Sequence, residues 1–417
     1  MKSEIIAVGS EMLTPFRQDT NSLYLTEKLN ELGVTVAFKT IVGDRRKDLV
    51  NAIGAALSRV DIVAIMGGLG PTEDDLTREA VAETLSLTLR RNPAQVAALA
   101  ARAATWRVPM PANNLKQADL LEGATLLPNP NGSAPGQWLD TTWQGYRKLL
   151  MLVPGPPNEC RPLFDAECLP RLREVLPVRH IARRTLRAAM IPESQADKLI
   201  APIYTEYKDV ETTILAKPGD IQLTLLCSKP SASSAQARVD ELASRMEEAL
   251  DDWLYSSNNE SSESLEQIVL YYLGLRQSTL AVAESCTGGM IAQRITSVPG
   301  SSRSFLGGAI VYSNELKTAF AGVPPKLIAE YGAVSREVAE ALASGIRRHT
   351  GATLGLGVTG IAGPTGGTEA KPVGLVHIAL SDAQKTESIE RTFRGDRTRV
   401  REWATQQALD LIRRKLR

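Results

Sequence analysis

The sequence predicts an α/β protein in which two open domains with mainly parallel sheets are joined by a small α+β domain. Strand-like runs alternate with helical patterns of 3.6-residue period in the first 170 residues and again after residue 264. A shorter, differently patterned stretch separates these two blocks. The length of 417 residues suits two to three domains at ~150 residues each. Strand–helix alternation is typical of parallel sheets with crossover helices.

The first block, residues 1–170, begins with a buried strand and continues as strand and helix in turn. Its β-branched runs predict strands, and its spaced leucines and isoleucines predict amphipathic helices. In chain order these segments are Ile5–Gly9, Leu23–Leu32, Val34–Gly43, Leu49–Leu57, Asp61–Gly68, Leu76–Leu85, Lys148–Glu159 and Cys160–Val175.

The middle block, residues 176–254, predicts a small α+β domain. Two strands within Val210–Pro230 meet at a Pro-Gly turn, and helices are expected over Ser194–Tyr207 and Ala235–Leu250. The polar stretch Ser256–Glu263 lacks apolar residues and indicates a linker.

The third block, residues 264–417, returns to the α/β pattern. Ser264 followed by Gln267 has the spacing of a capping box and predicts a helix start. Strands are expected at Ser278–Ala283, Gly307–Ser313, Ala352–Thr359, Val373–Leu380 and Ser388–Phe393, with helices between them and a last helix from Arg397.

Composition and charge narrow the functional classes. Hydrophobic residues make up 43% and charged residues 23%, which is ordinary for a globular protein. Lys and Arg total 48 against 47 Asp and Glu, so we expect neither a nucleic-acid nor a membrane partner. The four cysteines form no C-x-x-C pair, which favours a cytoplasmic protein without disulfides or a zinc cluster.

The run Glu284–Gly289 (ESCTGG) lies between a predicted strand and a predicted helix. Small residues let the backbone approach a ligand, and the first N–H groups of a helix favour anions. The run is therefore a candidate site for a phosphate or an oxyanion. A plain strand–helix turn, with Thr or Ser as the N-cap, explains it equally well.

Two further polar runs, Gly300–Ser302 and Thr359–Gly367, adjoin predicted strands of the same block. Ligands of open α/β sheets bind at the carboxyl ends of the strands. Several hydroxyl groups and Lys317, without a neighbouring histidine, suggest a hydrolase in which lysine activates a serine. A lysine can act as a base only where desolvation or a nearby cation lowers its pKa from ~10.4.

Taken together, the motifs of Leu265–Arg417 resemble the nicotinamide mononucleotide deamidase domain of the CinA family. The motifs are AESCTGG (283–289), PGSSRSF (299–305), VYSNELK (311–317), GAVS (332–335), VTGIAGPTGGTEAKPVG (358–374) and GDR (395–397). The resemblance implies hydrolysis of the carboxamide of nicotinamide mononucleotide, without a metal or cofactor, in a homodimer. It implies Ser302 as nucleophile and Lys317 as base, with Ser285, Tyr312 and Thr359 at the reaction centre. Substrate contacts are expected from Thr287, Gly288, Gly289, Gly360 and Arg397.

Three side chains compete for the role of nucleophile. A fully extended strand over Phe305–Tyr312 would separate its ends by roughly 25 Å at ~3.3 Å per residue, too far for Ser302 and Lys317 to share a proton. Either the chain near Ser302 folds back, or Ser285 is the nucleophile. Cys286 is intrinsically more nucleophilic, but a small buried thiol is its commoner role.

In the first block, GGLGPTEDDLT (Gly67–Thr77) follows a strand and opens a helix. Its amides suit a phosphate and its carboxylates a hard metal ion, although acidic residues in a first helical turn also complement the helix dipole. With GSE (9–11), VGD (42–44) and PGPPNE (154–159), this run resembles the molybdopterin-binding-like domain of CinA proteins. That resemblance implies metal-dependent ADP-ribose pyrophosphatase activity, with a divalent metal ion near Asp44, Asp75, Glu11 and Asp74.

Two departures qualify these expectations. Pro15 stands where members of the family commonly have glycine, and a proline there removes a donor and fixes φ. The middle block, expected to be KH-like, contains no G-x-x-G loop, so RNA binding is not expected. A rival hypothesis is a non-catalytic nucleotide sensor or scaffold, at least in the N-terminal half.

Overall fold

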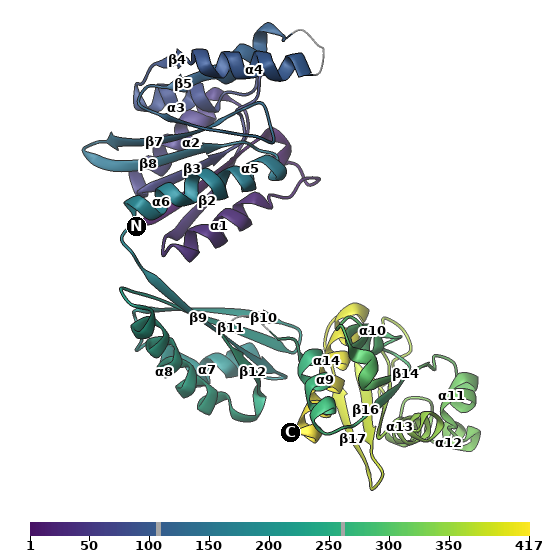
Figure 1. Cartoon of the computed structure of the whole chain (residues 1–417). Coiled ribbons are helices and arrows are strands. Elements are labelled where there is room, and N and C mark those ends of the chain that lie inside the picture. The colour runs from purple at the N-terminus through teal and green to yellow at the C-terminus, as the bar shows by residue number, and fades with distance from the viewer. Residues whose placement is uncertain (106–109, 260–262) are drawn as a thin grey trace. The chain divides into compact units, whose positions relative to one another are not determined.

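The computed structural model describes residues 1–105, 110–259 and 263–417. The chain divides into two compact units, one of residues 1–181 with 228–232 and one of the remaining described residues. Each unit is described by itself. The predicted α/β class with mainly parallel sheets is confirmed in both units (Figure 1).

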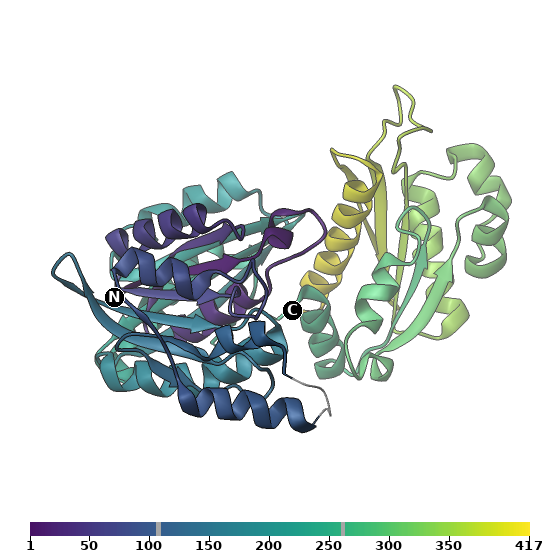
Figure 2. The same ribbon diagram turned by 90° about the horizontal axis from the view of Figure 1, so that it is seen from above.

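The first unit is built on a six-stranded sheet in the order β2-β1-β3-β8-β7-β6. Strands β2, β1, β3 and β8 are parallel, whereas β7 and β6 are antiparallel. The strands are β1 Lys2–Val8, β2 Thr35–Val42, β3 Ile62–Met66, β6 Thr125–Leu127, β7 Gly136–Trp143 and β8 Tyr146–Val153. Helices α1, α5 and α6 pack on one face and α2 and α3 on the other (Figures 1 and 2).

The helices of this unit are α1 Asn21–Glu31, α2 Arg46–Arg59, α3 Thr77–Leu85, α4 Pro93–Thr105, α5 Pro157–Leu163 and α6 Leu169–Val175. Short helical turns cover Ser10–Leu13, Ala112–Ala118 and Phe164–Cys168, and β4 Leu89–Arg91 pairs with β5 Asp119–Leu121. The sequence analysis left residues 86–147 unassigned; β4, β5 and β6 have only three residues each, but the longer α4 and β7 were missed as well.

The small domain in the second unit is a four-stranded antiparallel sheet with two helices. Its sheet order is β10-β11-β9-β12. The elements are β9 His180–Ala189, α7 Glu193–Tyr204, β10 Val210–Lys217, β11 Asp220–Lys229, α8 Ala232–Leu250, the turn Asp251–Trp253 and β12 Leu254–Asn258. The expected linker is therefore partly wrong, because its first three residues, 256–258, belong to β12 and pair with β9. Residues 260–262 of that linker lie outside the described residues.

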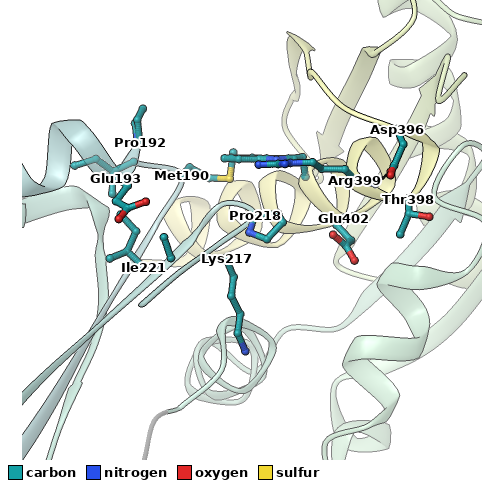
Figure 3. A pocket seen from close by; sticks show the side chains of 13 residues that line it. Met190, Pro192, Glu193, Lys217, Pro218, Ile221, Asp396, Thr398, Arg399 and Glu402 are labelled. Carbon is teal, nitrogen blue, oxygen red and sulfur yellow. Dashed lines mark hydrogen bonds between the residues drawn. The ribbon is translucent and has the colours of Figure 1, made fainter. Parts of the chain in front are cut away.

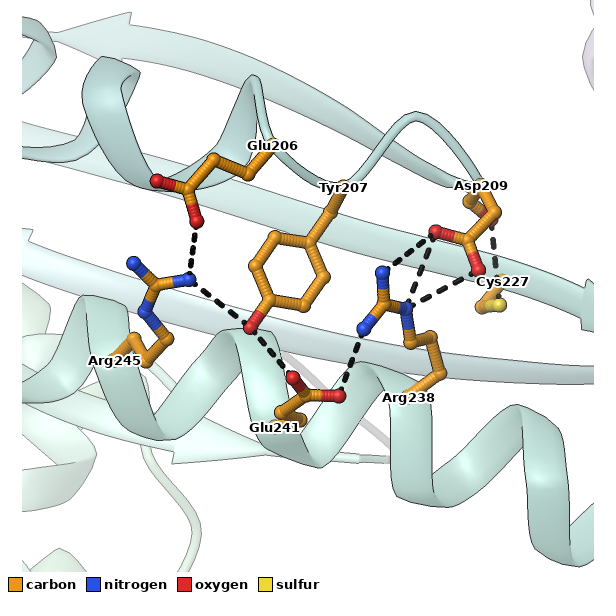
Figure 4. A network of polar contacts seen from close by, with 7 residues as sticks. All are labelled: Glu206, Tyr207, Asp209, Cys227, Arg238, Glu241 and Arg245. Carbon is orange, nitrogen blue, oxygen red and sulfur yellow. Dashed lines mark hydrogen bonds and ion pairs between the residues drawn. The ribbon is translucent and has the colours of Figure 1, made fainter.

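A network of charged side chains joins α8 to the segment that follows α7 (Figure 4). The hydroxyl of Tyr207 donates to Glu241 at 2.9 Å and accepts from Arg245 at 3.3 Å. The guanidinium of Arg238 lies 4.2 Å from the centre of the same ring and donates to Glu241 at 2.8 Å. These contacts hold α8 against the segment that follows α7. Because the charged groups bind one another, we assign the network a structural role.

The C-terminal part of the second unit has a five-stranded sheet in the order β14-β13-β15-β16-β17. Strands β14, β13 and β15 are parallel, and β16 and β17 are antiparallel to their neighbours. The strands are β13 Leu280–Glu284, β14 Phe305–Ile310, β15 Leu354–Gly360, β16 Leu375–Ser381 and β17 Thr386–Thr392. The helices are α9 Leu265–Leu275, α10 Met290–Thr296, α11 Asn314–Ala321, α12 Pro325–Tyr331, α13 Arg336–Thr350 and α14 Arg397–Leu416, with a short turn at Ser301–Arg303.

Small residues on β13 and β15 let α13 pack very close to the sheet. A Cβ at Gly357 would lie 2.4 Å from the carbonyl oxygen of Ala339, and one at Gly355 would lie 2.2 Å from that of Ala343. Helices α9, α10 and α14 cover the other face. The predicted capping box at the start of α9 is confirmed by the reciprocal bonds of Ser264 and Gln267. In the described part of the chain, no helix combines the length and the apolar character that crossing a membrane requires.

Candidate functional sites

A small pocket opens at the carboxyl ends of β14, β13 and β15, where the sequence analysis expected a site. Its volume is about 190 Å³, and it is lined by Ser285, Cys286, Tyr312, Asn314, Lys317, Ala333, Val334, Thr359, Gly360, Ala362 and Arg397. Six of the side chains and glycines predicted for the reaction centre or the substrate thus meet in one cavity. Asn314, Ala333 and Val334 lie in the motifs VYSNELK (311–317) and GAVS (332–335), but the sequence analysis gave them no role.

Lys317 is the most constrained member of this pocket. It is only 2% exposed, and its ammonium group donates to the carbonyl oxygens of Val311 at 3.0 Å and Tyr312 at 3.2 Å. In the described residues no carboxylate lies within 4 Å of its Nζ atom. Desolvation by burial lowers the pKa of Lys317 below its ordinary value of 10.5. This lysine therefore meets the electrostatic condition that the sequence analysis set for a general base.

The short helix α11 explains how Lys317 reaches this position. Ser313 caps the helix by accepting from the N–H of Leu316 at 3.3 Å. From the first turn of this helix the lysine side chain reaches back to the carbonyl groups of Val311 and Tyr312, the two residues that follow β14. Glu315 in the first turn is exposed, and its bond with the Ser313 side chain lowers the pKa of its carboxyl group.

Ser285 follows the end of β13, and Thr359 is the second-last residue of the neighbouring strand β15; they are 7% and 1% exposed. The hydroxyl of Thr359 donates to the carbonyl oxygen of Ala333 at 2.8 Å, which leaves its oxygen free only as an acceptor. Burial raises the pKa of the neighbouring Cys286 thiol to about 12. Cys286 is therefore a neutral thiol near pH 7 and a poor nucleophile there.

Tyr312 and Arg397 form the exposed rim of the pocket. Arg397 donates to the Tyr312 hydroxyl at 2.6 Å and to the carbonyl oxygen of Gly363 at 3.0 Å. No carboxylate in the described residues pairs with this guanidinium, so its positive charge faces the entrance. An anionic group of a ligand would be attracted to this rim.

Ser302 does not lie in this pocket. It is exposed in the turn Ser301–Arg303, which precedes β14, whereas Lys317 follows the other end of that strand. Six residues of strand at ~3.3 Å each separate the two by roughly 20 Å. The chain near Ser302 does not fold back, so the expected Ser302–Lys317 contact is not formed within one chain.

At the start of α10, where the sequence analysis offered either an anion site or a plain strand–helix turn, a side chain of the protein binds three of the backbone N–H groups. The carboxylate of Glu284, which is 1% exposed, accepts from the N–H groups of Gly289 at 3.0 Å, Ile291 at 3.1 Å and Ala292 at 2.8 Å. Thr287, Gly288 and Gly289 do not line the pocket, and the carbonyl of Thr287 accepts from Arg401 at 2.8 Å. A charged residue at the end of an apolar strand was the available signal for this internal cap.

A second pocket, of about 600 Å³, lies in the first unit at the carboxyl ends of its parallel strands. Glu11, Asp44, Asp74 and Asp75 all line it, together with residues 67–70 and the start of α5. The sequence analysis thus placed these four carboxylates correctly in one cavity. Pro15 lies just beyond the turn Ser10–Leu13 and is not among the lining residues.

These carboxylates do not converge as a metal-binding set. Asp44 accepts from the N–H of Ser10 at 2.8 Å, and Asp75 accepts from the N–H of Thr72 at 2.9 Å, so both close local turns. In the part of the chain that the structure describes, no three acidic, histidine or cysteine side chains are close enough to hold one ion. Carboxylates are suitable ligands for a hard cation, but their arrangement does not fit a resident metal.

A larger pocket of about 690 Å³ in the second unit has no comparable chemistry (Figure 3). Glu193, Asp396 and Glu402 lie around it with Lys217 and Arg399, so opposite charges are mixed at its wall. The polar groups select no class of ligand, and we assign no site there.

The comparisons with known proteins agree with this architecture. Residues 4–174 match the family described as "Probable molybdopterin binding domain", and residues 262–416 match "CinA C-terminal domain". The chain therefore combines a molybdopterin-binding-like domain with a CinA C-terminal domain.

Full-length relatives identify the family. The chain is 65% identical over 416 residues to a CinA-like protein of Acidobacterium capsulatum and 56% identical over 416 residues to one of Koribacter versatilis, with 100% of each chain covered. A solved structure of the competence/damage inducible protein from Agrobacterium tumefaciens is 36% identical, covers 35% of this chain and 90% of its own, and has a TM-score of 0.35. The protein belongs to the CinA family.

The buried Glu284 generates a first prediction. Replacing Glu284 by Gln removes the charge that three backbone N–H groups share, and hydrogen bonds to charged groups are each worth about 1.5–3 kcal/mol. We expect the free energy of unfolding to fall by at least about 2 kcal/mol. Urea denaturation measures the change, with Glu369→Gln on an exposed loop as the control. Equal stability of the two variants would contradict the internal cap.

Proposed function

We propose that the C-terminal domain is an amidohydrolase that converts nicotinamide mononucleotide to nicotinate mononucleotide and ammonia. The observation that carries this proposal is the buried amine of Lys317, which donates to two carbonyl oxygens and, among the described residues, has no carboxylate within 4 Å, in one pocket with Ser285. The resemblance of the surrounding motifs to the deamidase domain of the CinA family supplies the substrate.

The size and charge of the pocket support this substrate. A volume of about 190 Å³ is below the ~300–1,000 Å³ of sites that enclose drug-sized ligands. It suits the nicotinamide ring alone, with the ribose phosphate outside. Arg397 at the rim would then meet the phosphate, and Tyr312, whose oxygen accepts from Arg397, has its own proton available for the ligand.

The proposed reaction needs only the residues of the pocket and water. The neutral amine of Lys317 takes the hydroxyl proton of the serine as its oxygen attacks the carboxamide carbon. The resulting tetrahedral intermediate expels ammonia, which receives that proton from Lys317. Water then attacks the acyl-serine ester while Lys317 accepts a proton from it. Lys317 returns this proton to the serine oxygen as the ester bond breaks, which releases the nicotinate product and restores both the serine hydroxyl and the neutral amine.

Ser285 is the nucleophile that one chain can supply. Ser302 remains a second candidate only if another copy of the chain provides it, as a homodimer would. The strand that follows Ser302, β14, is at the edge of its sheet, and its side chains Leu306 and Ile310 are 49% and 53% exposed. An exposed apolar edge of this kind is a candidate surface for a second copy.

The pH dependence of deamidation tests Lys317. Because only the neutral amine accepts a proton, kcat/KM should rise with pH and level off above a pKa that burial lowers from 10.5. Glu315 raises the pKa of Lys317, so Glu315→Gln should move the rise to lower pH. Ammonia release from the mononucleotide measures both profiles. Lys317→Met should be inactive, and a Met variant that keeps the wild-type rate would refute the mechanism.

Serine variants decide which hydroxyl attacks. We expect Ser285→Ala to reduce kcat by a factor of at least about 10³, comparable to losses at activated nucleophiles. Ser302→Ala should keep most activity if Ser302 is only a surface residue. If Ser302→Ala is instead inactive, mixing it with Lys317→Met should restore activity in hybrid dimers, which would show that Ser302 acts from the other copy. Tight binding of the mononucleotide without any product would favour a nucleotide-sensing role.

For the first unit we propose a second activity, hydrolysis of the diphosphate of ADP-ribose. The observation in its favour is that a pocket of about 600 Å³ gathers four carboxylates beside a glycine-rich loop. The carboxylates do not form a resident metal site, so no step through a metal is derived.

Formation of AMP from ADP-ribose tests this second activity. We expect it to disappear in Glu11→Gln, because this exposed carboxylate lines the pocket. Glu122→Gln is the matched control, since Glu122 pairs with Arg90 and is not among the lining residues. Parallel assays with a chelator or with added Mg²⁺ show whether a cation is needed. AMP formation at the wild-type rate in Glu11→Gln would remove this carboxylate from the reaction.

A further inference from the structure

The proposed deamidation places a negative charge on the oxygen of the carboxamide when a serine attacks its carbon. A hydrogen-bond donor fixed beside that oxygen is usually among the largest contributions to the rate of such a reaction. A residue with this role must line the pocket and must have a proton that the protein does not already use. Most donors of the C-terminal pocket fail the second condition.

The donors deep in the pocket are already bonded. Both N–H groups of a neutral Lys317 amine are taken by two backbone carbonyl oxygens. The Thr359 hydroxyl donates to the carbonyl oxygen of Ala333 at 2.8 Å. The first amides of α10 bond the carboxylate of Glu284. These groups therefore have no proton left for an oxyanion.

Two further donors lie at the entrance of the pocket. Arg397 donates to the Tyr312 hydroxyl at 2.6 Å and to the carbonyl oxygen of Gly363 at 3.0 Å, and Tyr312 is 58% exposed. The proposed binding mode has the phosphate of the mononucleotide at this rim. Because the phosphate and the carboxamide are at opposite ends of the mononucleotide, another donor is needed for the carboxamide.

Asn314 is a donor without a partner. It is the first residue of α11 and lines the pocket, and among the described residues no group bonds its side-chain amide. Lys317 follows three residues later, and residues three apart lie on the same face of a helix. The side chains of Asn314 and Lys317 are therefore neighbours at the wall of the pocket. Among the described residues that line it, no other has a side-chain amide.

An amide group matches the carboxamide of the substrate. It has both a donor and an acceptor. It also has no charge, so it does not favour the ammonium form of Lys317 as a carboxylate would. Its NH₂ group can donate to the carboxamide oxygen while its oxygen accepts from the carboxamide NH₂. The carboxylate of the product has only acceptors, which makes it a poorer match for Asn314.

We propose that Asn314 is a catalytic residue that recognises the carboxamide of the substrate. Its Nδ2 atom donates to the carboxamide oxygen and stabilises the negative charge that forms there. Its Oδ1 atom accepts from the amino group that leaves as ammonia. This inference rests on the proposed deamidase function, and it adds the residue that distinguishes the amide from the acid.

Ammonia release by the full chain tests this role. Asn314→Ala should lower kcat for nicotinamide mononucleotide by a factor of about 10²–10³, the usual loss for one oxyanion donor, and should raise KM by less than about tenfold. Asn113→Ala, at an exposed asparagine of the first unit, is the matched control and should keep both constants. If the wild-type chain releases ammonia and Asn314→Ala keeps its kcat, the role of Asn314 is refuted and the deamidase function stands. A wild-type chain that releases no ammonia would overturn both.

The pH profile separates this role from a structural one. Asn314→Asp places a carboxylate beside Lys317, which raises the pKa of the amine, so the rise of kcat/KM should move to higher pH. Asn314→Ala should leave the pH of this rise unchanged although kcat falls. An unmoved profile in Asn314→Asp would show that the two side chains are not neighbours and would overturn the proposal.

Binding to a variant without turnover tests recognition directly. Calorimetric titration of Lys317→Met compares nicotinamide mononucleotide with nicotinate mononucleotide. Adding Asn314→Ala should weaken binding of the amide at least about threefold and should not weaken binding of the acid. Equal weakening for the two ligands would contradict the recognition of the carboxamide by Asn314.

Discussion

The C-terminal site depends on one constraint, the burial of the Lys317 amine away from water. Lys317 is buried beside two carbonyl oxygens, and a neutral amine has two N–H groups, so both can be donated while the lone pair stays available. A nearby carboxylate would favour the ammonium form and remove this base. The pocket avoids such a group: its lining includes hydroxyls, a thiol, an amide and an arginine, and Glu284 next to it is directed into α10.

The run Glu284–Gly289 and the loop of residues 67–70 have similar sequences, but their backbone N–H groups have different hydrogen-bond partners. Both runs follow a parallel strand, contain adjacent glycines and precede a helix, and both therefore predicted an anion site. In the C-terminal domain the carboxylate of Glu284 already bonds the free amides. In the first unit the buried guanidinium of Arg78 donates to the carbonyl oxygens of Leu69 and Gly70 instead, and the structure gives no acceptor for the N–H groups of these two residues. The charge of one buried side chain therefore decides whether it binds the N–H groups or the carbonyl groups of a glycine-rich turn.

The α/β class and the alternation of strands and helices along the chain could be predicted from the sequence. The meeting of Ser285, Lys317 and Thr359 in one pocket could be predicted as well, because parallel strands bring their carboxyl ends to one edge of the sheet. The sequence was not sufficient to place Ser302. Its motif precedes β14, and the sequence left open whether the chain near Ser302 folds back or stays apart from Lys317; the structure shows that it stays apart. Contacts of Arg78, Glu284 and Arg397 were missed because they join side chains to backbone atoms, which have no residue-specific pattern.

Cationic side chains that donate to backbone carbonyl oxygens recur around the C-terminal pocket. Arg397 holds Gly363, Arg401 holds Thr287, and Lys371 donates to the carbonyls of Tyr331 and Val334 at 2.7 Å. Ion pairs could hold the same loops, but each would bring a carboxylate close to this pocket. Carbonyl acceptors tie the loops without adding negative charge. In the described part of the chain these cationic side chains have no carboxylate partner, so an anionic group would be attracted to the surroundings of the pocket.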